Sequence, residues 1–315
     1  MIDRNPRMRS RSASLARFRL RSLACACVLA CAASANAAPP CEELGRDCPL
    51  QLHSDTARGV ALGTGLRASS ASTSALAYNP AALVLGKLYH LEGSVDYMSA
   101  WSAVALGAAV VDSATSKVGA GIAFRGFISG DEGVNGIDGR VALAFPFSDA
   151  ISIGLGGRYL DLEYSAIEDD EIVDTELVEG FTMDASLRIV PAPVVQLVLT
   201  AVNFVDVGSP YAPVLLGGGA AFAIAEIASV GGEVLVDVSS FDSAATLFGF
   251  GGEVLVAQLV PLRLGYSFDT KRELHTLSGG AGYTDRSVGF DLSISQQLSR
   301  DKDLRVIGAF RYYVR

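Results

Sequence analysis

The sequence has few charged residues and lacks the long apolar run of a membrane-spanning helix. Only 19% of its 315 residues are charged, although half of them are apolar. The uncharged stretch 207–225 contains two prolines and three consecutive glycines, which argues against a helix across a membrane. The net charge of −9 argues against nucleic acid as a partner, because nucleic-acid binders need clustered cations. The low charge and scattered hydrophobicity also argue against disorder.

Residues that carry out catalysis or bind metal ions are also scarce. The three histidines, at positions 53, 90 and 275, lie in different segments, and none has the spacing of a zinc site. No nucleophile occurs with a base and an orienting group in a recognisable pattern. We therefore predict that the protein is not an enzyme and uses no cofactor.

The first 37 residues have the layout of a secretory signal peptide. Residues 1–22 carry seven arginines and one aspartate, the apolar segment LACACVLACAA follows at 23–33, and Ala35-Asn36-Ala37 offers small residues for cleavage before Ala38. The apolar segment is too short to span a bilayer as a helix. An internal amphipathic helix, and a lipoprotein cleaved before Cys31, are the alternatives. The prediction is an exported protein.

Two cysteines remain after the predicted cleavage site. Cys41 and Cys48 lie close together in the segment CEELGRDC. An even pair of cysteines in an exported chain is typical of a disulfide. Free thiols or a metal site are less favoured, because no nearby histidine or third cysteine completes a set of ligands. We predict a local disulfide between the two.

Over most of the chain, apolar and polar residues alternate, as in strands with one apolar and one polar face. In 287–298, for example, Phe290 and Leu292 alternate with Asp291 and Ser293. These segments are longer than strands of soluble sheets, at about five or six residues, and match the length of a tilted membrane-spanning strand, about nine to eleven. The pattern predicts about fourteen strands: 87–98, 101–111, 117–128, 137–147, 150–163, 179–190, 194–206, 213–225, 228–240, 245–257, 259–269, 273–284, 286–298 and 304–315.

The connections between the predicted strands alternate in length. Tight turns such as 147–150 and 191–193 alternate with longer links, 129–136 and 165–178. Short turns on one side and longer loops on the other are typical of outer-membrane barrels. Because an unpaired amide is costly in hydrocarbon, such a sheet must close on itself, with its apolar face toward lipid. We predict an all-β fold over 87–315, a membrane-spanning antiparallel β-barrel in the outer membrane; a secreted sandwich or soluble barrel is the alternative.

The segment 38–86 shows no clear period and is rich in alanine, serine and glycine. It cannot build a core of its own, so it is predicted to form a hatch inside the lumen or to trail into the periplasm. The run GTGLRA at 63–68 is similar to a dinucleotide-binding fingerprint, but no strand–turn–helix unit or acidic partner accompanies it. Small residues that let backbone pass close to a barrel wall account for it better.

The segment AYNPAAL at 77–83, just before the first predicted strand, resembles the Asn-Pro-Ala signature of FadL-like outer-membrane transporters. The stretch GYSFDTKRELHTLSGGAGY at 265–283 also resembles the last hairpins of such barrels. The resemblance implies fourteen strands, an N-terminal hatch, and a small hydrophobic ligand that leaves through a gap in the wall. It assigns Asn79, Pro80 and Ala81 to the hatch, where proline and asparagine suit a rigid turn.

Two features depart from that family. The longest predicted link, 165–178, is short and acidic, whereas fatty-acid transporters of this class capture their ligand with long loops. The chain also ends in Tyr312-Tyr313-Val314-Arg315 rather than in an aromatic residue. The related PorV-type proteins carry a similar segment and serve secretion or surface attachment. The alternative is therefore a structural or adaptor barrel with a secretion-system or surface-protein partner.

Charged residues on the polar strand faces are predicted to point into the lumen, where they form structural ladders or a selectivity constriction. Glycines expected on the same face leave room for a plug; they include Gly154, Gly156 and Gly218. The acidic run that holds Glu168, Asp169, Asp170 and Glu171 is a solvated loop by default, with loose binding of a divalent cation as the weaker alternative. The predicted lumen charges are Arg140, Arg158, Asp184 and Arg188, with Glu233, Asp237, Glu253, Asp291, Arg305 and Arg311 on equivalent faces.

Overall fold

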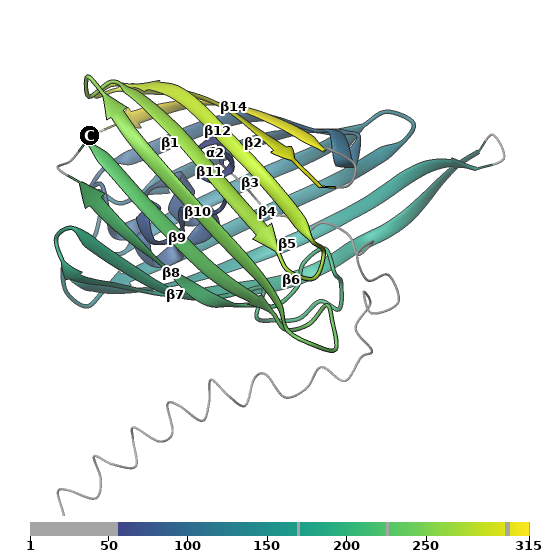
Figure 1. Cartoon of the computed structure of the whole chain (residues 1–315), viewed down its shortest axis with the longest axis horizontal. Helices are drawn as coiled ribbons and strands as arrows, with labels where there is room; N and C mark the ends of the chain where they lie inside the picture. Colours follow the sequence, from purple (N-terminus) through teal and green to yellow (C-terminus); the bar gives the residue numbers. More distant parts are fainter. Residues whose placement is uncertain (1–55, 169–170, 225–226, 300–302, 315) are drawn as a thin grey trace, which may run out of the picture. The chain divides into compact units, whose positions relative to one another are not determined.

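The computed structural model describes residues 56–168, 171–224, 227–299 and 303–314. In chain order its strands pair antiparallel, and the first also pairs with the last, so they close into a barrel (Figure 1). The predicted fourteen-stranded antiparallel barrel is thereby confirmed. The strands are β1 (Tyr89–Met98), β2 (Ala103–Asp112), β3 (Gly119–Ser129), β4 (Gly133–Pro146), β5 (Ile151–Glu168), β6 (Glu171–Ala192), β7 (Val195–Val202), β8 (Leu215–Ile224), β9 (Ala228–Asp237), β10 (Ala245–Val256), β11 (Val260–Asp269), β12 (Leu274–Thr284), β13 (Val288–Gln297) and β14 (Leu304–Val314).

The barrel presents its apolar side chains outward. On β13, Phe290 and Leu292 each expose 52% of their surface, whereas Asp291 and Ser293 on the opposite face are buried in the lumen. A large apolar band facing water would be strongly unfavourable, whereas in hydrocarbon it carries no such cost. The outer face is therefore the lipid-facing surface of a membrane-spanning barrel. No helix in the described part of the chain is long and apolar enough to cross a membrane.

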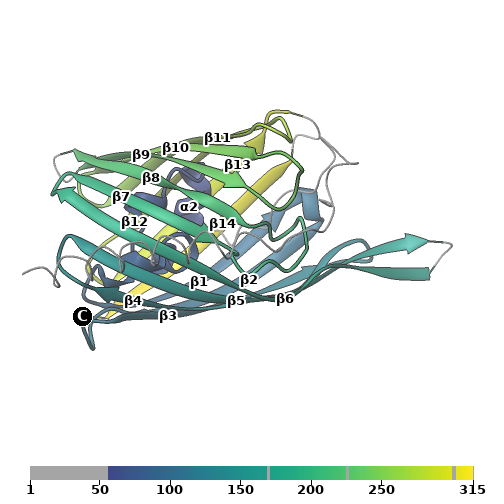
Figure 2. The same ribbon diagram turned by 90° about the horizontal axis from the view of Figure 1, so that it is seen from below.

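The two ends of the barrel differ. At one end, here called the terminal end, β1 begins, β14 ends and short turns join the strands. At the other, the loop end, the β5–β6 hairpin projects beyond the remaining strands (Figure 2). In transmembrane barrels the short turns face the periplasm and the longer connections face outward. The predicted signal peptide at 1–37 and the Cys41–Cys48 disulfide lie outside the described residues.

The prediction of a loop at 165–178 was wrong, because β5 and β6 continue through these residues as a paired hairpin. Ser165 pairs with Asp174, and its hydroxyl donates to the Asp174 carboxylate at 2.7 Å. Branched residues such as Ile167 and Ile172 favour extended backbone there, although the dense carboxylates suggested a loop. The expected link at 129–136 is likewise shorter, since β4 begins at Gly133. Between described strands the longest link is 203–214.

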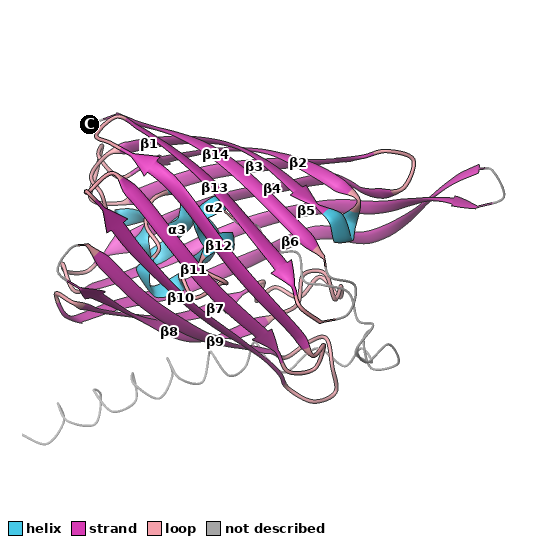
Figure 3. Cartoon of the chain, turned by 45° about the horizontal axis from the view of Figure 1, so that its top comes forward, coloured by secondary structure: helices cyan, strands magenta, loops and turns pink. Residues whose placement is uncertain are grey.

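Four short helices lie inside the barrel ahead of β1 (Figure 3). They are α2 (Ala57–Ala61), η2 (Arg67–Ser69), α3 (Thr73–Tyr78) and η3 (Pro80–Val84), and residues 56–84 are called the hatch from here on. The helix α2 contacts β11–β14, η2 contacts β7–β9, η3 contacts β3–β6 and α3 contacts β1–β4. The segment between α2 and η2 meets β10, so the hatch touches every strand of the wall.

Inward-facing glycines allow the hatch backbone to lie directly on the wall. A Cβ at Gly251 would meet the carbonyl oxygen of Leu62 at 2.5 Å, and a Cβ at Gly265 would collide with the backbone of Leu62 and Gly63. A side chain at either wall position would therefore push the hatch away. Gly218 was expected on this inner face but points outward. Its register partners Leu199 and Val234 are both exposed, because the alternation on β8 places residue 218 among the lipid-facing positions.

Candidate functional site

The predicted hatch motif forms the turn between α3 and η3. Asn79 caps the C-terminal end of α3, where its backbone N–H donates to the carbonyl of Ala75 at 2.9 Å, and Pro80 begins η3. The Asn79 side chain is fully buried and donates to the carbonyl of Arg67 at 3.2 Å, while its Oδ1 has no hydrogen-bond partner. The motif is thus a rigid turn packed within the lumen.

Ala81 attaches this turn to β5 and β6. Its backbone N–H donates to the hydroxyl of Ser186 at 2.8 Å, and its carbonyl accepts from the hydroxyl of Ser152 at 2.8 Å. A Cβ at Gly154 would collide with the Ala81 backbone, so this glycine permits the close approach. Two hydroxyls and a glycine therefore clamp the motif to the wall.

Two arginines of the hatch form ion pairs with the wall. Arg58 binds both carboxylate oxygens of Glu253, each at 3.1 Å, and Arg67 donates to Glu233 at 3.2 Å. Sequence reasoning named the two glutamates as lumen charges but missed the arginines. The available signal was that Arg58 and Arg67 are the only charged residues of the segment 56–84, and a buried cation requires a partner.

The four predicted lumen charges all face inward, and three of them lie together. Arg158 binds Asp138 through two bonds of 3.1 and 2.9 Å. Arg140 lies 3.5 Å from Asp184 and also donates to the carbonyl of Ala77 in the hatch at 3.1 Å. Wall charges here thus hold the neighbouring strands and the hatch in register. The fourth charge, Arg188, stands apart and donates to the amide oxygen of Gln196 at 3.4 Å.

The opposite wall carries a second chain of ion pairs. Arg263 joins Glu253 at 2.5 Å to Asp291 at 2.7 Å, and Arg305 binds Asp96 at 3.0 Å.

Among the described residues, His, Cys, Asp and Glu side chains form no group able to hold a metal ion. Asp169 and Asp170 of the acidic run lie outside that part of the chain; Glu168 and Glu171 pair across the tip of the β5–β6 hairpin.

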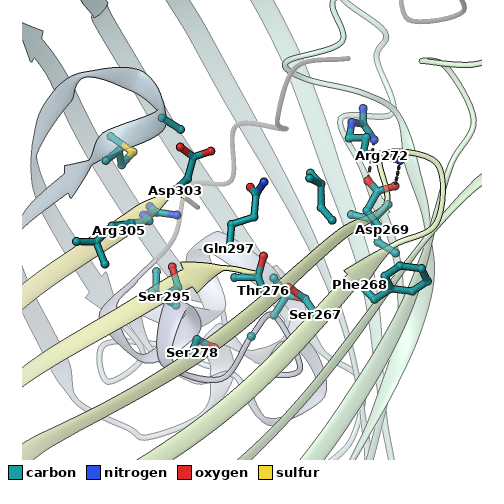
Figure 4. Close-up of a pocket in the computed structure, with 18 of the residues that line it drawn as sticks. Ser267, Phe268, Asp269, Arg272, Thr276, Ser278, Ser295, Gln297, Asp303 and Arg305 are labelled. Atoms are coloured by element: carbon teal, nitrogen blue, oxygen red, sulfur yellow. Dashed lines mark hydrogen bonds and ion pairs between the residues drawn. The ribbon is translucent and has the colours of Figure 1, made fainter. Parts of the chain in front are cut away.

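A cavity of about 200 Å³ lies in the lumen between the hatch and the loop end (Figure 4). Val60 and Gly63 of the hatch form part of its lining, together with Met98 of β1 and Trp101 of the helix η4 (Ser99–Trp101). Along β11–β13 most of the lining is polar. These wall residues are Ser267, Thr276, Ser278, Ser295 and Gln297.

Beside the cavity, an apolar cluster packs the lumen at the loop end. Its members come from β1–β6 and the link 203–214, and Trp101 contacts Tyr211 edge-on, with 5.6 Å between ring centroids. Burial raises the pKa of Tyr211, with a further contribution from Tyr164. On the side of β1–β6 the lumen is therefore apolar at this end and charged at mid-height. Buried residues of this cluster are Met98, Trp101, Ala103, Ala105, Phe127, Val134, Leu160, Leu162, Val178 and Ala212.

The wall around the site is continuous. Each described strand is hydrogen-bonded to both of its neighbours, and register shifts occur only between β5 and β6 at Leu162/Glu163 and between β6 and β7 at Ile189/Ala192. The gap in the wall that the resemblance implied is not formed in this part of the chain. A compound in the cavity is thus separated from the terminal end by the hatch.

No protein-family model matches the sequence, and no curated protein matches it. Solved structures share its fold. The toluene transporter TbuX of Ralstonia pickettii aligns over 84% of this chain and 99% of its own, with 13% identity and a TM-score of 0.61. A FadL homologue of Pseudomonas aeruginosa aligns over the same shares, with 10% identity and a TM-score of 0.61. The toluene transporter TodX of Pseudomonas putida gives 13% identity over the same shares and a TM-score of 0.58.

At these identities the likeness establishes the fold. The chain has the barrel architecture of these transporters over nearly their full length. The predicted FadL-like barrel is thereby confirmed as a resemblance of fold.

Proposed function

We propose that the protein is an outer-membrane channel through which small hydrophobic compounds diffuse passively. The observation that carries the proposal is the cavity on the loop side of a hatch that touches every strand of the wall. A lumen closed in this way admits a compound from the loop side and releases it only when the hatch moves. The fold shared with two toluene transporters supports the same class of cargo.

Movement of the hatch is the step that costs free energy. Leaving the wall breaks the Arg58–Glu253 and Arg67–Glu233 pairs or the two hydroxyl contacts of Ala81. A compound that enters the cavity supplies contacts that offset part of this cost, so it shifts the hatch toward the open arrangement. No energy source is required, because the compound moves down its own gradient.

Uptake of labelled toluene by Gram-negative cells tests the proposal. Cells whose outer membrane carries the protein are expected to take up toluene faster than cells that lack it. The double variant Asn79→Ala/Pro80→Ala disrupts the turn and is expected to admit a small sugar that the unaltered protein excludes. Toluene uptake equal to that of cells without the protein contradicts channel function. An unchanged exclusion of sugar in the variant contradicts the hatch role of the motif.

The alternative is an adaptor barrel, for which the extensively packed lumen is the favouring observation. An adaptor needs no cavity on the loop side and needs a partner protein. Purification of the tagged protein from outer-membrane extracts distinguishes the two functions. A stoichiometric secretion or surface protein, together with absent toluene uptake, favours the adaptor.

A further inference from the structure

We propose that the cavity binds neutral, ring-sized molecules that carry a hydroxyl group, such as phenol, in preference to bare hydrocarbons. This inference rests on the proposed function for its biological meaning, but binding itself is independent of transport. Its starting point is size. A cavity of 150 Å³ can accommodate benzene, and the volume here is about 200 Å³. A single ring with one substituent is of matching size.

The polar side of the cavity is a contiguous patch of hydroxyl groups. In the strand register, Ser267 pairs with Thr276, and Ser278 pairs with Ser295. All four face the lumen from β11, β12 and β13 (Figure 4). Within the described residues the hydroxyls of Ser267, Thr276 and Ser295 form no hydrogen bond with protein, whereas Ser278 makes a long one of 3.4 Å to Ala61. Three hydroxyls are therefore free to bond a ligand.

The other side of the cavity is apolar and aromatic. Met98 and Trp101 are buried there and Val60 of the hatch also lines this side, while Leu274 of β12 and Leu247 of β10 add apolar side chains next to the hydroxyl patch. An aromatic ring fits against such a surface. The two sides together suit a molecule with one apolar body and one polar group. Bare hydrocarbons leave the hydroxyl patch without partners, which costs part of the binding free energy.

Charges at the cavity favour a neutral ligand. Arg272 is paired with Asp269 at 2.9 Å, and Arg305 is paired with Asp96 at 3.0 Å. Asp303 adds a carboxylate to the lining, so an anionic ligand meets like charge without a free cation. The cavity thus disfavours a fatty-acid carboxylate and accommodates an uncharged hydroxyl.

Trp101 is the only tryptophan of the chain, so its fluorescence reports on this cavity. The purified full-length protein in lipid nanodiscs is titrated with phenol and with toluene, which differ by one hydroxyl in place of a methyl group. We expect phenol to bind more tightly. The triple variant Ser267→Ala/Thr276→Val/Ser295→Ala is expected to weaken phenol binding about tenfold and to leave toluene binding unchanged or tighter. Ser229→Ala removes a lumen-facing hydroxyl outside the cavity and serves as the matched control.

Equal or tighter binding of toluene by the unaltered protein overturns the inference, as does phenol binding that the triple variant does not weaken. Absence of any fluorescence change with both compounds, confirmed by equilibrium dialysis, also overturns it. Correct folding of each variant is checked by its resistance to unfolding in detergent. Phenol binding without uptake by cells leaves the inference standing and contradicts the proposed function alone.

Discussion

Single charged residues determine how firmly the hatch is held. Glu253 accepts from Arg58 of the hatch and from Arg263 of the wall, and Arg263 continues to Asp291. One carboxylate therefore pairs with two cations in a lumen partly shielded from water. Removing the charge of Glu253 is strongly unfavourable, because Arg58 then loses the carboxylate that binds it.

Glu253→Gln keeps the shape of the side chain and removes its charge. We expect it to lower the free energy of unfolding by about 2 kcal/mol, the range for a lost charge-assisted hydrogen bond. Urea unfolding in lipid vesicles measures the difference. Asp149→Asn, which alters an exposed carboxylate in a terminal turn, is the control and should have no effect. Equal stability of the Glu253 variant and the control contradicts the assigned role.

The turn before β13 provides a test by pH. The backbone N–H groups of Val288 and Ser287 donate to Asp285 at 2.8 and 2.7 Å and hold the pKa of Asp285 below its usual range. Because the folded-state pKa is lowered, this stabilisation is complete at neutral pH and is lost as the pH falls through the folded pKa. We expect protection of these two amides from hydrogen exchange to drop only in strong acid. In Asp285→Asn, protection that still shows this step argues against the carboxylate as its cause.

Much of this residue-level detail could be read from the sequence, and some could not. Alternation correctly places Asp291 and Arg140 in the lumen, because a strand's period fixes the face of each side chain. The partners depend on strand register and on the path of the hatch, which alternation does not encode. Pairs such as Arg58 with Glu253 are therefore visible only in three dimensions. Gly218 was misplaced because glycine carries no polarity to mark its face.

At the scale of elements, the inward glycines are the surface on which the hatch rests. Gly265 has no room for a Cβ, because the hatch backbone at Leu62 and Gly63 occupies that space. Gly279 on the neighbouring strand faces outward. A Cβ added there would have its nearest neighbouring atom at 3.5 Å, which is an ordinary contact distance. The two positions therefore form a matched pair on adjacent strands.

Gly265→Ala is expected to displace the hatch and raise ion conductance in planar lipid bilayers, whereas Gly279→Ala is expected to behave like the unaltered protein. Alanine is at least as compatible with a strand as glycine, so both barrels should form. Single-channel recording gives the conductance, and heat modifiability on gels verifies the barrel. Identical conductance in both variants shows that the close approach does not seal the lumen.

The β5–β6 hairpin is the element that extends beyond the barrel. Asp161 lies opposite Glu179, and Glu163 lies opposite Glu176. Like charges opposite one another destabilise a strand pair, so this hairpin is held by its backbone ladder and by its attachment to the wall. Sequence reasoning found the other strands within a few residues of their bounds. It missed this extension because carboxylates obscured the alternation.

Replacement of residues 166–173 by Asn-Gly joins Ser165 to Asp174 through a favoured two-residue turn. We expect the barrel to assemble and to resist heat as before, because the removed residues lie beyond the apolar cluster at the loop end. Heat modifiability of the folded protein on gels is the readout. Failure of the shortened chain to form a heat-modifiable barrel contradicts the view that the tip of the hairpin is dispensable.

At the scale of the whole molecule, two parts close the barrel. The strands of the wall form a complete ring, and the hatch fills the lumen of that ring. The wall has no unpaired edge, since β1 pairs with both β2 and β14. The hatch then fills the ring from within by touching all of its strands. Composition and strand length indicate such a ring from the sequence alone, because lipid as solvent leaves few other solutions for the backbone. Composition and strand length do not indicate where the hatch lies against the wall.

If compounds pass only when the hatch leaves the wall, a covalent link between the two should stop them. The ring carbon Cγ of Pro80 lies 3.6 Å from the position that a Cβ at residue 156 would take. Because a cysteine Sγ at position 80 branches from the Cβ as this Cγ does, we expect cysteines at positions 80 and 156 to lie within bonding reach. The variant Pro80→Cys/Gly156→Cys is prepared in a background without native cysteines, with each single-cysteine variant as control.

Toluene uptake by cells that carry this double variant is measured before oxidation, after oxidation and after reduction. We expect uptake to fall on oxidation to the level of cells without the protein and to recover on reduction, with no change in the single-cysteine controls. Undiminished uptake by the fully oxidised double variant would show that the hatch stays against the wall while compounds pass.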